Sequence, residues 1–492
     1  MTDLLPSPEI CDRARAARDA RFDGLFFTAV KSTGIYCRPI CPAPTPKPEN
    51  IRYFANAAAA SAAGFRPCLR CRPELSPNAM QHRYADEWVN RSLALIAEGE
   101  FLEGSVATLA KKIGLSTRQV GRLFQRNLGA SPIAVHTNRR LLLAKQLLTE
   151  TSMPMTEVAL ASGFKSIRRF NAAFIEGCAL APSAIRRLQT PVTSGRLSLR
   201  LAYRPPFDFA LMLAFLAKRA IPGIEKITAS SYERVAGPIN QTCLIRVTRD
   251  AKKPELHLEI ANADPRMIPD LVQRTRRLFD LDADLQVVNA GLQSSELLRL
   301  GIERRPGLRV PGCWDGFEVA VRAVIGQQIS VAGATTITAR LVAQFGAIRT
   351  DAKGELDRAF PTADVLALAS LEGLGLTKAR MNTLRALAQA AADGAIHFQA
   401  GQKADDFEQK ICLIPGIGPW TAQYVAMRAL RQPDAFLAGD LVLQQVLGGD
   451  ARLSEREAAA LSQAWRPWRA YAVMHLWHLS SDDKNLEKSH VV

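Results

Sequence analysis

The chain has 492 residues, of which 48% are hydrophobic, so it is long enough to form three or four domains with buried cores. Its 63 Lys and Arg residues outnumber 47 Asp and Glu, and the net charge of +16 favours a polyanionic partner. No apolar run reaches the about 18 residues that a membrane helix needs, and the start MTDLLPSPEICDRARAARDARF lacks the apolar core of a signal peptide. The sequence therefore predicts a cytoplasmic protein with no membrane partner.

Four of the nine cysteines lie within the first 80 residues as two close pairs. The spacing is Cys37-x3-Cys41 and Cys68-x2-Cys71, with 26 residues between the pairs. Such pairs can place four thiolates around one tetrahedral Zn²⁺, and a reducing compartment disfavours disulfides. The sequence therefore predicts one zinc ion held by these four cysteines.

The segments FFTAVKSTGIYCRPIC and NAAAASAAGFRPCLRCRPE resemble the N-terminal domain of Ada-type adaptive-response proteins. The resemblance implies a small α+β domain over residues 1–80, in which the zinc-bound thiolate of Cys37 accepts a methyl group from DNA methylphosphotriesters. Zinc keeps a thiol ionised, and methyl transfer would remove one negative charge, so DNA affinity should rise afterwards. The neighbouring arginines, which could steer the DNA backbone or be ordinary surface charge, are Arg38, Arg66, Arg70 and Arg72.

A basic helical block follows over residues 81–190. Residues 101–200 hold 15 Lys and Arg against 4 Asp and Glu, which indicates a nucleic-acid partner. The stretch VATLAKKIGLSTRQVGRLFQRNLGASP is echoed by MTEVALASGFKSIRRFNAAFIEGCALAP, each reading as helix, Gly turn, helix and Pro exit.

The block resembles an AraC-type domain, all-α, with two helix-turn-helix motifs. Recognition helices enter the major groove of double-stranded DNA, where Arg, Gln and Asn read base edges. Two motifs in one chain imply two adjacent major-groove contacts from a monomer, about one helical turn apart. For a regulator of this kind, RNA polymerase at promoters is the expected protein partner. The candidate reading residues are Gln119, Arg122, Arg126, Arg168, Arg169 and Asn171.

After a polar linker, LQTPVTSGR, the rest of the chain resembles DNA-3-methyladenine glycosylase II of the AlkA type. The resemblance is carried by YRPPFDFALMLAFL, RRLFDLDADLQVV, GLRVPGCWDGFEVAVRAVIGQQISV, LIPGIGPWTAQYVAMRAL and WRPWRAYAVMHLWHL. It implies an α+β subdomain over residues 197–310 and an all-α helix-hairpin-helix domain over residues 311–480.

The turn at Pro415, Gly416 and Gly418 exposes backbone N–H groups at a helix start, which can bind a DNA phosphate without reading sequence. Asp440 follows in a stretch that is otherwise nearly uncharged. A fixed anion stabilises the positive charge that develops on the sugar when an N-glycosidic bond breaks. Asp440 could also cap the helix LVLQQVL, and the two roles are compatible.

Trp420 and Tyr424 are four residues apart and so share a helix face. By resemblance they line a base pocket with Trp477, Phe209 and Phe215, although core packing is an alternative for the two phenylalanines. Electron-rich rings favour cationic bases such as 3-methyladenine.

A base must be flipped out of the duplex to be reached. The resemblance places the residue that fills the gap at Gln328, together with Gln327. The family usually has an apolar residue at this position and an aromatic residue where Leu441 stands, so both are departures.

Bifunctional relatives carry a Lys where Trp420 stands, so no Schiff base and no strand cleavage are expected. We find no cysteine motif for an iron–sulfur cluster and no Pro-Cys-His-Arg motif of an alkylguanine transferase. The prediction is an alkylation-response protein that joins a monofunctional glycosylase to a DNA-binding regulator. Two alternatives are a non-enzymatic regulator that uses the glycosylase fold only to bind DNA, and a repair enzyme that its N-terminal half merely recruits to damage.

Overall fold

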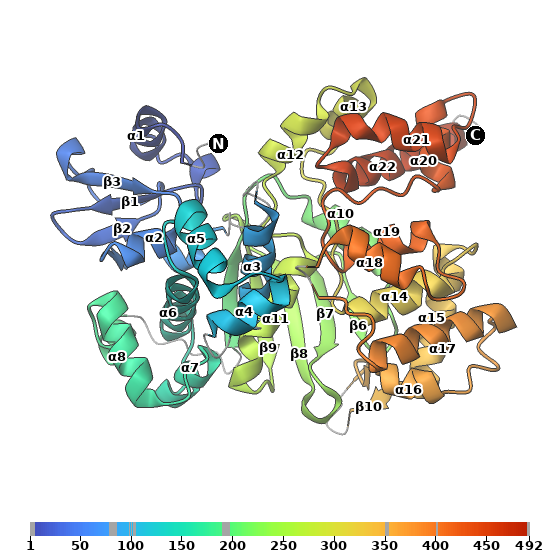
Figure 1. Cartoon of the computed structure of the whole chain (residues 1–492), viewed down its shortest axis with the longest axis horizontal. Helices are drawn as coiled ribbons and strands as arrows, with labels where there is room; N and C mark the ends of the chain where they lie inside the picture. Colours follow the sequence, from blue (N-terminus) through green and yellow to red (C-terminus); the bar gives the residue numbers. More distant parts are fainter. Residues whose placement is uncertain are drawn as a thin grey trace. The chain divides into compact units, whose positions relative to one another are not determined.

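The computed structural model describes residues 5–77, 86–97, 99, 101, 105–188, 197–349, 354–399 and 402–489, so the LQTPVTSGR linker lies almost entirely outside the described residues. The chain divides into two compact units (Figure 1). The first comprises residues 1–204, 243–276 and 281–283, and the second comprises residues 205–242, 277–280 and 284–492. The division passes through residues 197–310, a segment that the sequence suggests as a single subdomain.

The first unit begins with a small α+β module. Its four-stranded sheet has the order β3-β1-β2-β4, and Thr28 of β1 lies opposite Cys37 of β2. Four consecutive buried alanines, Ala57–Ala60, let α2 lie close to the sheet, where Phe27, Tyr36 and Phe54 complete the core. The elements are α1 (Pro8–Ala16), η1 (Ala20–Phe22), β1 (Phe27–Val30), β2 (Ile35–Cys37), η2 (Pro48–Asn50), β3 (Ile51–Phe54), α2 (Ala57–Ala62), β4 (Arg66–Pro67) and η3 (Pro73–Leu75).

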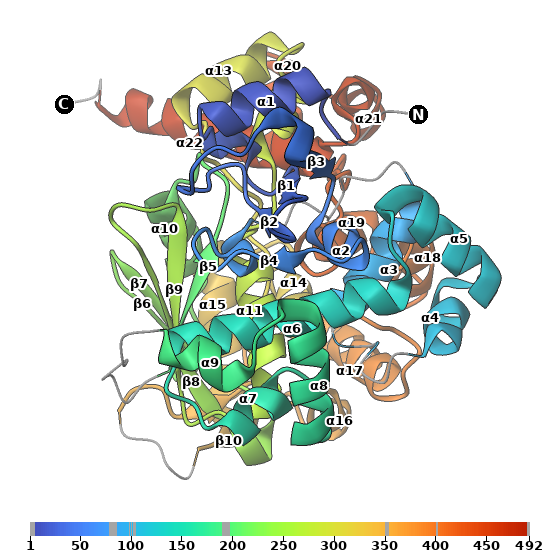
Figure 2. The same cartoon turned by 90° about the vertical axis from the view of Figure 1, so that its left-hand side faces the viewer.

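Within the described residues of the same unit seven helices come next along the chain, and the long α6 lies between the α3–α5 group and the α7–α9 group (Figure 2). Gly114 and Gly129 end α4 and α5 in the left-handed conformation, which glycine adopts without steric cost. Gly177 of α8 has no Cβ, and an added one would lie 2.4 Å from Leu141 of α6. The helices are α3 (Glu87–Ala97), α4 (Val106–Ile113), α5 (Thr117–Leu128), α6 (Pro132–Glu150), α7 (Met155–Ala161), α8 (Ile167–Cys178) and α9 (Pro182–Arg187).

Three antiparallel strands complete the first unit, in the order β5-β9-β8. Apolar residues alternate along them, and Leu199, Leu256 and Leu258 are fully buried. The elements are β5 (Leu197–Ala202), β8 (Cys243–Arg249), β9 (Glu255–Ala261), η5 (Pro265–Met267) and α11 (Ile268–Leu278), whose last two residues belong to the second unit.

The second unit is mainly helical, with the antiparallel hairpin β6–β7 near its start. A two-residue pairing, β10 with β11, adds a little strand to a part of the chain that the sequence predicts to be all-α. The elements are α10 (Phe209–Ala217), β6 (Glu225–Ile227), β7 (Ser231–Ala236), η4 (Ile239–Gln241), α12 (Leu285–Leu292), α13 (Glu296–Arg304), α14 (Gly316–Ile325), α15 (Val331–Phe345), β10 (Ala347–Ile348), β11 (Arg358–Ala359), α16 (Ala363–Leu368), α17 (Lys378–Ala392), α18 (Ala404–Ile411), α19 (Pro419–Arg428), α20 (Leu441–Gly448), α21 (Glu455–Leu461), η6 (Ser462–Trp465) and α22 (Arg469–Ser489).

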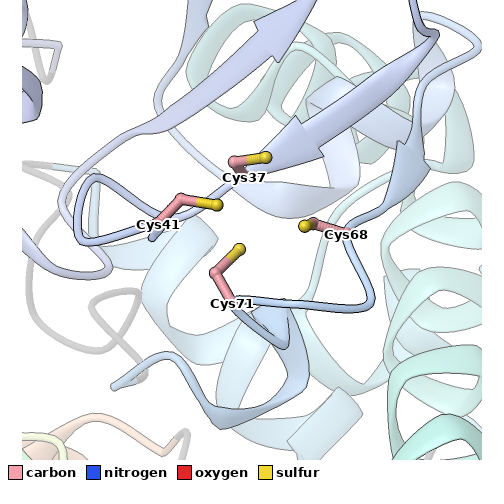
Figure 3. Close-up of side chains that lie close together, drawn as sticks. All are labelled: Cys37, Cys41, Cys68 and Cys71. Atoms are coloured by element: carbon pink, nitrogen blue, oxygen red, sulfur yellow. The ribbon is translucent and has the colours of Figure 1, made fainter. Parts of the chain in front are cut away.

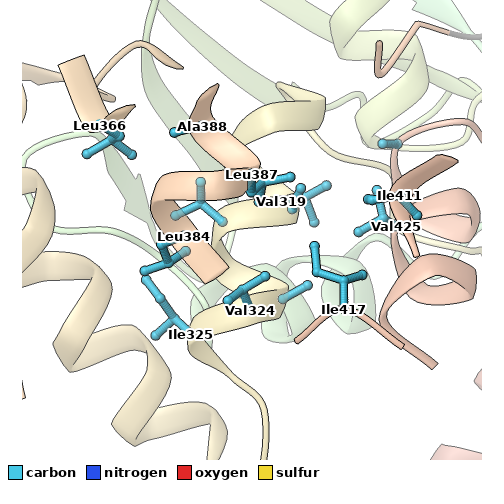
Figure 4. Close-up of a cluster of buried hydrophobic side chains, with 14 of the residues drawn as sticks. Val319, Val324, Ile325, Leu366, Leu384, Leu387, Ala388, Ile411, Ile417 and Val425 are labelled. Carbon is cyan, nitrogen blue, oxygen red and sulfur yellow. The ribbon is translucent and has the colours of Figure 1, made fainter. Parts of the chain in front are cut away.

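The core of the second unit is aliphatic and joins α14, α17, α18 and α19 (Figure 4). Val324 and Leu387 are fully buried there, as are Ile411 and Val425. These contacts hold α19, which carries Trp420 and Tyr424, against α14 and α18. None of the helices in the described part of the chain is both long and apolar enough to cross a bilayer.

We expect Leu387→Ala to lower the unfolding free energy of the second unit by about 2–5 kcal/mol, because it leaves a cavity in this core. Urea unfolding followed by tryptophan fluorescence measures it, since Trp88 is the only tryptophan outside residues 284–492. The matched control is Leu368→Ala, whose side chain is 88% exposed and should cost less than about 0.5 kcal/mol. Equal losses in the two variants would contradict the assignment of this core.

Candidate functional site

A cavity of about 540 Å³ lies within the second unit. Its wall is built from residues of α10, β6, β7, α11, α14, α15, α19, α20 and α22 and the loops beside them. Trp420, Tyr424, Asp440 and Trp477 all line it, although 57 residues separate the first from the last. Four residues that the sequence predicts for one site therefore share one cavity.

Asp440 is held in place by four hydrogen-bond donors. Its Oδ1 accepts the backbone N–H groups of Val442 and Leu443, each at 3.0 Å, so it caps α20 as the sequence suggests. The indole N–H of Trp420 donates to Oδ2 at 3.1 Å, and that of Trp477 donates to Oδ1 at 3.4 Å. The two tryptophans are thus also hydrogen-bond donors to the carboxylate, a role that the sequence did not reveal.

Trp420 and Tyr424 are stacked with ring centroids 5.4 Å apart and an interplanar angle of 5°. The other two predicted pocket aromatics lie elsewhere. Phe209 is buried against Phe207 and Phe279, and the Phe215 ring contacts the guanidinium groups of Arg219 and Arg428. Neither phenylalanine lines the described cavity. Phe209 is therefore packed in the core, whereas Phe215 is partly exposed.

Three arginines lie near the Tyr424 hydroxyl, of which Arg428 is buried and Arg219 and Arg322 are partly buried. Arg428 donates to it at 2.7 Å, and the guanidinium of Arg219 lies 3.7 Å from the centroid of the Phe215 ring. Burial acts to raise the pKa of Tyr424, but the charges of Arg428, Arg219 and Arg322 together lower that pKa below its usual value. Burial also lowers the pKa of Arg219.

A fourth arginine of the cavity wall, Arg234, is paired with a carboxylate. Glu318 pairs with Arg234 at 2.5 Å, and burial raises the pKa of Glu318. The sequence pointed to Asp440 but not to the other charged residues of the cavity wall, among them Arg322 and Arg428. The available signal was a single charge inside an apolar helical run, as in VRAVIG and AMRAL, which is the same signal that singled out Asp440.

The loop before α15 and the turn before α19 are joined by Gln327. Its Nε2 donates to the backbone oxygen of Gly416 at 2.9 Å and to Thr421 at 3.1 Å, so this side chain holds the turn. Gln328 is exposed, and its φ of +58° is in the left-handed region. Pro415 and Gly418 are exposed in the turn.

The predicted base-reading residues lie on α5 and α8 of the first unit. Arg122 and Arg126 are exposed on α5, as are Arg168 and Arg169 on α8, and Asn171 is partly exposed. Gln119 is exposed, but its side-chain oxygen accepts the backbone N–H of Ser116 at 2.9 Å in a capping box. Part of its hydrogen-bonding capacity is therefore used to start the helix.

The four cysteines meet between the ends of β2 and β4, with all four Sγ atoms within 4.8 Å of one another (Figure 3). Cys68 and Cys71 are buried, whereas Cys37 and Cys41 are partly accessible. Hydrogen bonds with Cys41 and Cys68 raise the pKa of Cys37, and hydrogen bonds with Cys37 and Cys41 lower the pKa of Cys68. Thiols this close share protons and cannot all ionise without a cation, and a set of four thiolates suits zinc.

Two arginines beside the cysteines point inward. The Arg38 guanidinium pairs with Asp23 and donates to the backbone oxygen of Cys71 at 3.1 Å. Arg72 pairs with Glu74 and Glu150. Neither is an ordinary surface charge, whereas Arg70 is exposed.

Comparison with known proteins places four families along the chain. The metal binding domain of Ada matches residues 10–74, a helix-turn-helix domain matches 109–188, the AlkA N-terminal domain matches 198–315, and the HhH-GPD superfamily of base excision DNA repair proteins matches 321–470. The probable bifunctional transcriptional activator/DNA repair enzyme AlkA of Mycobacterium tuberculosis is 38% identical over 476 residues, which cover 95% of this chain and 96% of that protein. The chain belongs to this family of bifunctional transcriptional activators and DNA repair enzymes.

The repair part of the chain is a DNA glycosylase of the HhH-GPD superfamily. DNA-3-methyladenine glycosylase 2 of Escherichia coli is 34% identical over 281 residues, which cover 56% of this chain and 96% of that enzyme. The structure of 3-methyladenine DNA-glycosylase from Archaeoglobus fulgidus shares the fold, with a TM-score of 0.50 at 17% identity over 57% of this chain and 98% of that one. The domain content that the sequence predicts, including the zinc-binding and helix-turn-helix segments, is confirmed.

We expect Gly416→Ala to destabilise the turn before α19 by about 1–3 kcal/mol, because residue 416 has a left-handed backbone. Its φ is +87°, and an added Cβ would lie 2.2 Å from the Thr383 hydroxyl oxygen. Gly418→Ala is the control, since its φ is −105° and no atom lies within 4 Å of the added Cβ. Urea unfolding monitored by tryptophan fluorescence should separate the two variants, and similar curves would show that the turn does not require glycine at 416.

Proposed function

We propose that the chain is an alkylation-damage response protein that excises alkylated bases of the 3-methyladenine type, accepts methyl groups from DNA methylphosphotriesters on Cys37, and activates transcription. The proposed layout has the methyl-acceptor domain at residues 1–80 and the paired helix-turn-helix domain at 81–190. The glycosylase then occupies residues 197–310 and 311–480. The observation that carries the repair proposal is the Asp440 carboxylate, held by four donors at the wall of a cavity with stacked aromatic rings.

In the proposed reaction the flipped base enters the cavity and the C1′–N bond breaks, with its electron pair leaving on the base. The Asp440 carboxylate stabilises the positive charge that develops on the sugar. A water oxygen then bonds to C1′ and its proton passes to solvent. Because Trp420 occupies the position of an amine nucleophile, hydrolysis ends the reaction without strand cleavage.

The rings of Trp420 and Tyr424 supply the preference for a base that carries positive charge. The charges of Arg428, Arg219 and Arg322 lower the pKa of Tyr424 and so favour the ionised form of its hydroxyl. A base that is already cationic leaves without a strong general acid, and the cavity wall needs only to hold it. The indole N–H groups of Trp420 and Trp477 fix the orientation of Asp440.

Double-stranded DNA is the proposed partner of the turn before α19. Its backbone N–H groups at Gly416 and Gly418 would bind a phosphate at the helix start. Gln328, exposed in the loop before α15, would fill the space left by the flipped base. Gln327 holds the loop before α15 next to this turn, because its side chain donates a hydrogen bond to the backbone oxygen of Gly416.

Cys37 is the proposed methyl acceptor, and Cys41, Cys68 and Cys71 complete the ligand set for one zinc ion. Bound zinc would keep the thiolate form available at neutral pH. The Cys37 sulfur attacks the methyl carbon, the carbon–oxygen bond breaks, and the phosphodiester leaves with the electron pair. The partial exposure of Cys37, compared with the buried Cys68 and Cys71, supports this choice.

The exposed arginines of α5 and α8 support reading of two adjacent major-groove sites by one chain. RNA polymerase at promoters is the proposed protein partner, the chain is proposed to act as a monomer, and the cytoplasm is its proposed location. A second candidate function is a regulator that uses the glycosylase fold only to bind DNA. The four hydrogen bonds that hold Asp440 favour the enzyme, because DNA binding alone does not require a carboxylate fixed in an aromatic cavity.

Asp440→Asn should lower the rate of 3-methyladenine release from alkylated duplex by about 10²–10³-fold, because it removes the anion that stabilises the transition state. Binding to the same duplex should change little. Asp450→Asn is the control, since it makes the same chemical change at an exposed position near the end of α20. Base release is measured by chromatography, and an unchanged rate in Asp440→Asn would leave only the DNA-binding function.

The purified chain should contain about one zinc per chain by elemental analysis, and Cys71→Ala should lose it. Cys178→Ala is the control, because Cys178 is a buried thiol outside the cluster. After incubation with methylphosphotriester DNA, the peptide that contains Cys37 should gain one methyl by mass spectrometry. A methyl on Cys41, the other partly exposed sulfur of the cluster, would move the acceptor role to that residue.

A further inference from the structure

Strand β5 is an edge strand, since it begins the order β5-β9-β8. The outer edge of such a strand presents unpaired backbone groups, which proteins cover or otherwise protect. Here helix α6 covers them with two side chains. The backbone N–H of Arg200 donates to Glu150 at 3.0 Å, and Gln146 donates to the backbone oxygen of Arg200 at 2.8 Å.

The side chains of Glu150 and Arg200 also form an ion pair with each other, and Glu150 has further donors. Oε1 of Glu150 accepts from Nε of Arg200 and from Nη2 of Arg72, each at 2.8 Å. Oε2 accepts from Gln146 at 2.9 Å in addition to the Arg200 backbone. The Glu150 side chain is 6% exposed, so its four donors replace nearly all of its water.

Arg72 continues the network to the cysteine loop. It donates to Glu74 at 2.9 Å and to the hydroxyl of Thr149 at 2.5 Å. Glu74 binds Lys145 of α6, and the Lys145 ammonium also donates to the backbone oxygen of Cys68 at 3.2 Å. Glu74 and Lys145 are each 1% exposed, so water cannot substitute for either partner.

The network thus joins residues from three families that the chain combines: Arg72 from the metal binding segment, Glu150 from the helix-turn-helix segment, and Arg200 from the AlkA N-terminal segment. A carboxylate with two guanidinium partners on different segments can hold both only while each stays in place. Burial raises the pKa of Glu150 to about 7 although Arg72 and Gln146 act to lower it, so the charged carboxylate needs all of its partners at this site.

We propose that α6 and the edge of β5 form an internal docking surface, in which Glu150 couples the position of the cysteine loop to strand β5. The regulatory segments and the first strand of the repair segment then behave as one body. A change at the loop that moves Arg72 reaches β5 through Glu150. The proposal does not depend on methyl transfer to Cys37 or on base release.

Hydrogen–deuterium exchange on the full-length, metal-loaded chain tests the coupling, since exchange reports the stability of individual segments. Glu74→Gln removes a charge from the loop and should lower the protection of the β5 amides, Leu197–Ala202, by about tenfold. Glu150→Gln should lower it by a similar factor. In the Glu150→Gln background, adding Glu74→Gln should cause no further loss.

Glu49→Gln is the matched control, because Glu49 is exposed in the same module. The protection of β1, Phe27–Val30, shows whether each variant keeps the module folded. If Glu74→Gln unfolds it, Thr149→Val replaces it, since this change keeps all charges and removes the hydroxyl that accepts from Arg72 and donates within α6 to the backbone oxygens of Lys145 and Gln146. Unchanged β5 protection in Glu150→Gln, or an equal loss from the loop variant in both backgrounds, would overturn the coupling.

Discussion

Charged groups that leave water must find partners inside the protein, and this constraint shapes both the cavity of the second unit and the joining of segments in the first. A lone buried charge is costly, whereas a charge with several well-placed donors or counter-ions is stable. Asp440 meets the requirement with two indoles and two backbone amides. Glu150 meets it with two guanidiniums, a carboxamide and a backbone amide.

In the cavity the same constraint connects stability with chemistry. The arginines on its floor are held by Tyr424, by backbone oxygens and by the Phe215 ring, and Arg234 pairs with Glu318. Because these groups are fixed before a base arrives, little reorganisation is needed when charge develops on the sugar. The aromatic pair is likewise stacked in advance, and α19 is held by the aliphatic core behind it.

In the first unit the constraint concerns the joining of segments. A chain that combines regulatory and repair families could in principle carry them as separate domains on linkers. Instead, side chains of α6 complete the hydrogen bonds of the β5 edge, and the cysteine loop packs against the same helix through Arg72 and Lys145. These contacts between segments use charged side chains that would stay in solvent if only an exposed linker joined the segments.

The sequence by itself was enough for the domain content, the cysteine cluster and the cavity residues Trp420, Tyr424, Asp440 and Trp477. The cysteine cluster follows from the spacing of paired cysteines, whereas the domain content and the cavity residues follow from motifs that resemble those of known families. Only the tertiary structure decided that Phe209 lies in the core, that Gln327 holds the turn, and that Arg38 and Arg72 point inward. The edge contact of Arg200 with Glu150 was also beyond the sequence, because partners 50 residues apart meet only when the chain has folded and water has been excluded from between them.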